Sequence, residues 1–132
     1  MASNDHIKNA VLDKVFSGRR WHKVGRAKFA SNGHVVHVRY CSPASKNNPH
    51  YKFNINHNTL TADYELWICG SENTYYLIPM DVIREMYNHP DAYVDNHHPD
   101  ITIVSVYTNK HEVMYAAGGT TLNLYEFYRQ TL

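Results

Sequence analysis

The side chains best suited to chemistry lie in one short segment, His34–Cys41 (HVVHVRYC). Its pattern is that of a β-strand, in which successive side chains point to opposite faces of a sheet. His37 and Arg39 therefore lie on one face as neighbours. Histidine transfers protons near neutral pH and arginine binds phosphate oxygens. These two residues are accordingly the candidate catalytic pair for cleavage of a phosphodiester.

A second segment of chemical interest is the basic stretch from Ser17 to Lys28 (SGRRWHKVGRAK). Cations interleaved with an aromatic ring suit nucleic acid, because the cations bind phosphates and the ring stacks on a base or sugar. The alternative is a solvated connection between a helix and a strand, with the tryptophan covering the core. The predicted nucleic-acid-binding residues are Arg19, Arg20, Trp21, Lys23, Arg26, Lys28, Arg39 and Tyr40.

Ten histidines and two cysteines raise the question of a metal site. The chain lacks the C-x-x-C, H-E-x-x-H and paired H-x₃₋₅-H spacings that mark such sites. His34 and His37 point to opposite faces of the predicted strand, so they cannot share an ion. The segment Asn88–Asp100 (NHPDAYVDNHHPD) is a second conceivable metal or acid–base cluster, but its composition is typical of a solvated loop. We therefore expect no metal ligands and no cofactor.

Composition and charge suggest where the protein works. The formal charge of +1 neither requires nor excludes a polyanionic partner. Cys41 and Cys69 both fall in predicted strands, which is typical of buried thiols in a reducing compartment. The first residues have no apolar core like that of a signal peptide, and no segment is long enough to span a membrane. We expect a cytoplasmic protein without a membrane partner.

Hydrophobic periodicity predicts the elements around these segments. An apolar stripe predicts a helix over Asp5–Phe16 that ends before Gly18, and Ser31-Asn32-Gly33 is a hairpin turn between strands 24–30 and 34–41. Later elements are strands at 51–55, 64–69, 74–78, 101–107 and 112–117, a helix after Pro79 and a short C-terminal helix opened by Asn123 and Glu126. The expected fold class is α+β, with residues 1–132 forming one domain around a mixed, mainly antiparallel sheet.

Four short motifs occur in order along these elements: His37-Val38-Arg39, Tyr51-Lys52-Phe53, Asp63-Tyr64 and Tyr76-Leu77-Ile78-Pro79. With the succession of elements, they resemble the small PD-(D/E)xK nuclease-like proteins of restriction and DNA-processing systems. The resemblance covers about residues 5–87, and residues 88–132 add a loop, a hairpin and a helix. It implies a nuclease fold, DNA as the partner, and a role in a restriction, mobile-element or phage–host conflict system.

The chain departs from that family at the metal site. In such nucleases, acidic residues on the first hairpin hold Mg²⁺, which activates water against the phosphodiester. The corresponding positions here are Ala27 or Lys28 on the first strand and His37 and Arg39 on the second. No Asp or Glu occurs between Lys14 and Thr61. The resemblance therefore implies a protein that holds phosphate without cutting it.

The sequence leaves three alternative hypotheses for the function. The first is a DNA-binding, nuclease-like protein without the usual metal-dependent cleavage. The second is an active endonuclease or phosphodiesterase with a rebuilt site around His37 and the His/Asp loop, and only this reading needs Mg²⁺. The third is a protein-binding inhibitor module that uses a surface rich in the eleven tyrosines. A homodimer is a further partner to consider, because a second chain could supply the missing carboxylates.

Overall fold

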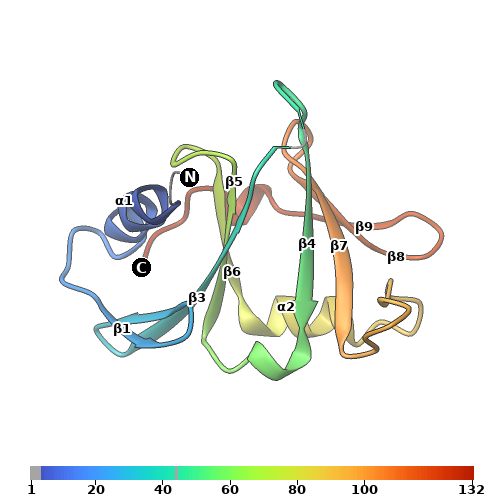
Figure 1. The fold of residues 1–132 in the computed structure, drawn as a ribbon, viewed down its shortest axis with the longest axis horizontal. Coiled ribbons are helices and arrows are strands. Elements are labelled where there is room, and N and C mark those ends of the chain that lie inside the picture. Colours follow the sequence, from blue (N-terminus) through green and yellow to red (C-terminus); the bar gives the residue numbers. More distant parts are fainter. Residues whose placement is uncertain (1–3, 44) are drawn as a thin grey trace.

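The computed structural model describes residues 4–43 and 45–132, which form two β-sheets and two α-helices (Figure 1). This is the α+β single-domain fold class that the sequence predicts. None of the described helices is both long and apolar enough to cross a membrane. The elements in chain order are α1 (Asp5–Val15), β1 (His22–Gly25), β2 (Lys28–Ser31), β3 (His34–Cys41), β4 (His50–Asn56), the 3₁₀ helix η1 (His57–Thr59), β5 (Tyr64–Cys69), β6 (Tyr75–Pro79), α2 (Met80–Tyr87), β7 (Ile101–Tyr107), β8 (Glu112–Ala116), β9 (Thr120–Asn123) and the 3₁₀ helix η2 (Tyr125–Phe127).

The strands divide into a five-stranded sheet of order β1-β2-β3-β5-β6 and a four-stranded sheet of order β4-β7-β8-β9. Neighbouring strands are antiparallel except β3 and β5, which run parallel. Parallel neighbours need a long crossover connection. Here the crossover consists of β4 and η1, so the chain leaves the first sheet, begins the second, and returns (Figure 1).

Helix α1 covers one face of the five-stranded sheet (Figure 1). Its apolar stripe is buried at Val11, Leu12 and Val15, which pack against the side of β3 that carries Val36 and Val38. Burying such side chains is the main source of stability for a short amphipathic helix. The predicted stop is confirmed, because Gly18 follows the helix with a left-handed φ of 77°.

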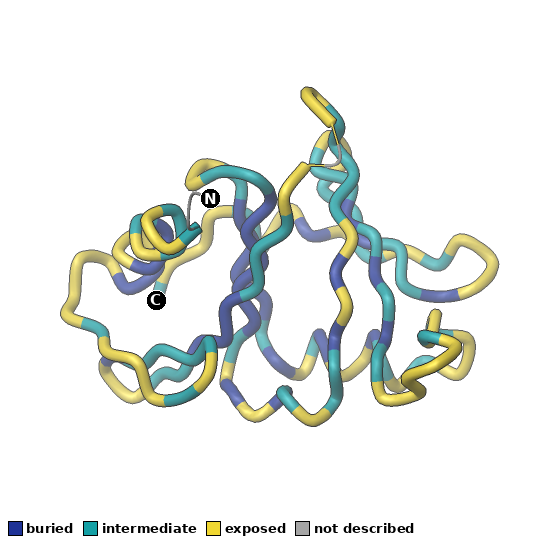
Figure 2. The backbone as a smooth tube through the Cα atoms, in the orientation of Figure 1, coloured by how far each residue is buried: buried dark blue, intermediate teal, exposed yellow. Residues whose placement is uncertain are grey.

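A second core lies on the other face of the five-stranded sheet, against the four-stranded sheet and α2. Phe53 of β4 stacks on Trp67 of β5 with ring centroids 5.2 Å apart, which joins the two sheets. Ile83 and Met86 of α2 are buried in the same cluster. Figure 2 shows that buried residues are concentrated on the strands at the middle of the molecule. Strand β5 is buried on both faces and has neighbours on both sides, as its apolar sequence predicts.

Three details differ from the predicted elements. Residues 24–30 do not form one strand, because a turn at Arg26-Ala27 divides them into β1 and β2. Ala27 adopts a left-handed φ of 55°, a conformation that alanine rarely takes and that its sequence therefore conceals. The C-terminal helix is only the 3₁₀ turn η2, whose N-cap position is Leu124 and not the predicted Asn123. The side chain of Asn123 still accepts a hydrogen bond from the backbone N–H of Tyr125. Thr120–Asn123, for which the sequence predicts no element, form the additional strand β9.

The buried thiol and phenol groups of the core predict that the protein loses stability at high pH. Burial raises the pKa of the Tyr75 and Tyr76 phenols and of the Cys69 thiol above their ordinary values. The folded protein therefore keeps protons that the unfolded chain releases, so stability falls with rising pH once the unfolded groups ionise. We expect the free energy of unfolding to decline above about pH 9, by up to about 1.4 kcal/mol per pH unit for each such group. Urea unfolding at a series of pH values measures this, and an unchanged midpoint up to about pH 11 would contradict it.

Candidate nucleic-acid interface

The predicted basic segment becomes a β-ribbon at the edge of the five-stranded sheet, which we call the basic hairpin and define as residues 19–31. β1 and β2 pair antiparallel, with Lys23 opposite Phe29 and Gly25 opposite Lys28. Strand β1 has only one neighbour in the sheet, so the ribbon forms an edge of the molecule (Figure 1). The hydroxyl of Ser31 donates to the carbonyl oxygen of Arg20 at 2.7 Å, which fixes the start of the ribbon to its end.

The cations of the basic hairpin are accessible. The side chains of Arg19, Arg20, Lys23 and Arg26 are exposed. Within residues 4–43 and 45–132, no carboxylate lies at ion-pair distance from any of these four. Lys28 differs, because it is half-buried and its ammonium donates to the hydroxyl of Thr61. Four of the predicted cations therefore remain available for an anionic partner, and Lys28 instead joins β2 to the segment before β5.

The two predicted stacking residues are held by the protein. The indole N–H of Trp21 donates to Oδ1 of Asp13 at 2.7 Å, and its ring contacts Phe29 edge-on at 5.4 Å between centroids. The hydroxyl of Tyr40 donates to the carbonyl oxygen of Gly70 at 3.3 Å. Both rings border the core beneath α1. Trp21 therefore fits the alternative that the sequence left open, a tryptophan that covers the core.

His37 and Arg39 lie on one face of β3, as predicted. Both approach a third residue that is not among the predicted site residues. This residue is Glu65 of β5, whose carboxylate is fully buried. Nε of Arg39 donates to Oε1 of Glu65 at 2.5 Å. Nδ1 of His37 lies 2.8 Å from Oε2, at an angle outside hydrogen-bond geometry. We call these three residues the buried charge cluster.

Both terminal nitrogens of Arg39 also donate hydrogen bonds. One terminal nitrogen donates to the carbonyl oxygen of Asn54 in β4 at 2.9 Å, and the other donates to the hydroxyl of Thr59 at 2.9 Å. Arg39 therefore links both sheets and the η1 segment, and its side chain is only 15% exposed. A guanidinium held by three partners in this way stabilises the fold and leaves little capacity for a phosphate.

The position of Glu65 in the sequence already indicates that this residue has a buried partner. Tyr64–Cys69 is otherwise apolar, and a glutamate inside a strand buried on both faces is rarely found without a paired or hydrogen-bonded partner. The nearest candidates by strand pairing are His37 and Arg39, since β3 and β5 are parallel neighbours. That pairing depends on the crossover through the second sheet, which local periodicity does not reveal.

The histidines do not converge on a metal centre. No group of three or more His, Cys, Asp or Glu side chains in the described part of the chain could hold an ion. In the 88–100 segment, Oδ1 of Asp95 accepts from the backbone N–H groups of His97 and His98, at 2.9 and 3.1 Å. These local bonds form a turn, and both imidazoles are exposed. The segment therefore has the character of a solvated loop.

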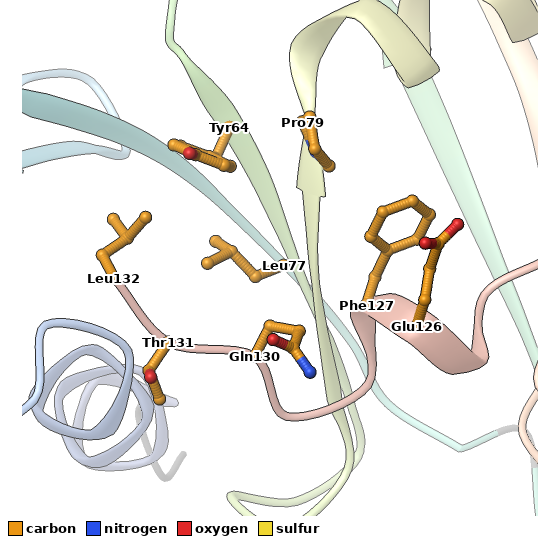
Figure 3. Close-up of a pocket in the computed structure, with 8 residues that line it drawn as sticks. All are labelled: Tyr64, Leu77, Pro79, Glu126, Phe127, Gln130, Thr131 and Leu132. Carbon is orange, nitrogen blue, oxygen red and sulfur yellow. The ribbon is translucent and has the colours of Figure 1, made fainter.

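One surface hollow contains none of the predicted site residues. It has a volume of about 270 Å³ and lies between β5, β6 and the C-terminal segment, with Leu77 at the centre of its lining (Figure 3). Polar and apolar groups share its lining, and Glu126 supplies an acidic side chain. No nucleophile and base are paired there. A smaller hollow of about 220 Å³ lies between α1 and the basic hairpin and is lined by Asp5, Lys8, Asn9, Lys23 and Phe29.

No model of a protein family, no curated protein sequence and no solved structure matches this chain.

Proposed function

We propose that this protein binds nucleic acid, DNA in the first place, by gripping the phosphate backbone with the basic hairpin, and that it does not cut the strand. The observation that carries the proposal is a separation of charge. Residues 19–28 hold five of the thirteen Lys and Arg residues and none of the twelve acids, so the rest of the chain has a net charge of −4. A nearly neutral protein thus has one strongly cationic edge, which would orient it toward a polyanion.

The geometry of the hairpin supports phosphate contacts. Arg19, Arg20, Lys23 and Arg26 are all solvated, so contact with DNA requires no breaking of internal ion pairs. β2 also pairs with β3, so the hairpin is the edge of the five-stranded sheet, and its exposed cations can follow one strand of a DNA backbone. Lys8 of α1 and Lys23 of the ribbon also line one hollow, which adds a further cation beside the hairpin.

Two features favour binding without cleavage. The hairpin strands and β3 contain no carboxylate, although Mg²⁺ requires hard oxygen ligands. The nearest buried acid, Glu65, has both carboxylate oxygens facing His37 and Arg39. The order of α1, the hairpins, β5, β6 and α2 is the order on which the resemblance to PD-(D/E)xK proteins is based. We therefore extend the proposal to a nuclease-like protein that has lost its acidic site.

One substitution at the tip of the ribbon tests the binding mode. Arg26→Ala should weaken binding of a DNA duplex about fivefold near physiological salt, because it removes one phosphate contact. It should also reduce the slope of log affinity against log salt by about one. Lys110→Ala removes the same charge from an exposed turn in the second sheet and should change neither quantity. Fluorescence anisotropy with a labelled duplex measures both.

Two results would contradict the proposal. Absence of DNA binding by the wild type at low salt would overturn it and would leave the protein-binding inhibitor module as the hypothesis to test. If the wild type instead cleaves plasmid DNA in Mg²⁺ while a folded His37→Ala variant does not, that result would favour the hypothesis of an active endonuclease. Arg39→Ala is not a suitable probe, because loss of binding could follow from loss of the buried charge cluster.

A further inference from the structure

The two cysteines of the chain occupy matching positions on neighbouring strands. Cys41 is the last residue of β3 and Cys69 is the last residue of β5, and the two are register partners in the parallel pair. Neighbouring strands lie about 4.8 Å apart, which falls within the range of about 4.4–6.8 Å between the Cα atoms of disulfide-bonded cysteines. Register partners project from the same face of a sheet, and both side chains contact the core between the sheets. The backbone therefore places the two cysteines at a Cα spacing that a disulfide can bridge.

The two thiols differ in access to solvent. Cys69 is 2% exposed, whereas Cys41 is half-buried at the edge of the core, with its sulfur 3.4 Å from the carbonyl oxygen of Ser42. Burial raises the pKa of the Cys69 thiol well above its ordinary value, and the proximity of Cys41 adds to the shift. Cys69 is thus protected from small reagents in the surrounding water. Cys41 is the thiol that an oxidant reaches first.

We propose that Cys41 and Cys69 form a dithiol redox site that a hydroperoxide converts into an intramolecular disulfide. In the first step the sulfur of Cys41 attacks the terminal oxygen of the hydroperoxide, and the O–O bond breaks. The leaving oxygen takes the Cys41 proton and departs as an alcohol, or as water when the oxidant is hydrogen peroxide. Cys41 is left as a sulfenic acid, and the peroxide has been reduced by two electrons.

In the second step the sulfur of Cys69 attacks the sulfur of Cys41. The S–S bond forms, the S–O bond of the sulfenic acid breaks, and the hydroxyl leaves as water with the proton of Cys69. The neighbouring position of Cys69 makes this step intramolecular, so it outpaces attack by a thiol of another molecule. A disulfide reductant reverses the change.

The disulfide would join β3 to β5 at the end where the 42–49 connection leaves the first sheet. The backbone N–H of Gly70 already donates to the carbonyl oxygen of Cys41 at 3.0 Å there, so the strands need little movement. The bond would close the part of the chain that contains β4 and η1, which restricts the unfolded state and raises stability. The basic hairpin precedes the opposite end of β3, so oxidation should leave DNA binding unchanged. This inference is therefore independent of the proposed function.

Hydrogen peroxide applied to the reduced, folded wild-type protein tests the site. We expect the intact mass to fall by two hydrogens, the count of thiols accessible after unfolding to fall from two to zero, and no disulfide to form between two chains. Peptide mapping without reductant should link the Cys41 and Cys69 peptides, and the oxidised protein should unfold at a higher temperature than the reduced protein. A product that gains oxygen at Cys41 while Cys69 remains a free thiol would overturn the proposal, as would a disulfide-linked dimer.

Two variants separate the roles of the thiols. Cys69→Ala should stop at the sulfenic acid, which a dimedone probe traps on Cys41. Cys41→Ser should leave Cys69 unreacted in the folded protein, because that sulfur is buried. Rapid oxidation of Cys69 in the folded Cys41→Ser protein would contradict the assigned order of reaction. The wild-type mass measurement decides the main point even if a variant fails to fold.

Discussion

Replacement of Glu65 by alanine is expected to lower the free energy of unfolding by about 3–5 kcal/mol, the largest loss of stability that we predict for a single side chain. The change leaves the guanidinium of Arg39, which is only 15% exposed, without the carboxylate that it now contacts at 2.5 Å. A buried cation without its counter-charge costs far more than the net value of the original pair. The loss would be a large part of the stability of an ordinary domain, about 5–15 kcal/mol.

A double replacement distinguishes an unpaired charge from simple loss of packing. Arg39→Met combined with Glu65→Leu removes both charges while it keeps apolar volume, and should be clearly more stable than Glu65→Ala. Urea unfolding, followed by circular dichroism, gives the free energies and their coupling. A double variant that is no more stable than Glu65→Ala would indicate that the bonds of Arg39 to Asn54 and Thr59 are the more important part of the cluster.

The surface pair Lys14–Glu72 provides a matched control. Its charged atoms are 3.9 Å apart, and the side chains are 41% and 49% exposed. Water screens such a pair, so Glu72→Ala should change the free energy of unfolding by less than about 1 kcal/mol. If Glu65→Ala had an equally small effect, the buried charge cluster would have to be accessible to water in solution.

Simultaneous replacement of the four exposed cations of the basic hairpin is expected to reduce DNA affinity by roughly 10²–10³-fold near physiological salt. The variant Arg19→Ala/Arg20→Ala/Lys23→Ala/Arg26→Ala removes as many as four phosphate contacts. Each contact contributes about 0.9 to the slope of log affinity against log salt, so the slope should fall by about three to four. All four side chains are solvated, so the fold itself should be little affected.

A second fourfold variant shows whether position or total charge matters. Lys46, Lys52, Arg84 and Lys110 are also exposed, and their replacement by alanine changes the net charge by the same amount. The proposed interface predicts nearly wild-type affinity and salt slope for this control. Equal losses in both variants would mean that DNA responds only to overall charge, and the basic hairpin would then have no special role.

Local sequence patterns determined the elements that depend on neighbouring residues. The stripe of Val11, Leu12 and Val15 specified α1, and Asn32-Gly33 specified the turn between β2 and β3, because left-handed backbone is easy for these two residues. The apolar run of β5 correctly indicated a central strand. Alternation along β3 also placed His37 and Arg39 on one face, which the structure confirms.

The tertiary structure determines which residues those side chains contact. The sequence separates Arg39 from Glu65 by 26 residues, and only the parallel pairing of β3 with β5 brings them together. The same pairing places Cys41 beside Cys69, although neither thiol has a motif around it. Periodicity describes which face a residue occupies, but the partner on the next strand depends on how the chain crosses between sheets. The exposed charge of the basic hairpin could therefore be predicted from sequence, whereas the buried charge cluster and the dithiol pair required the fold.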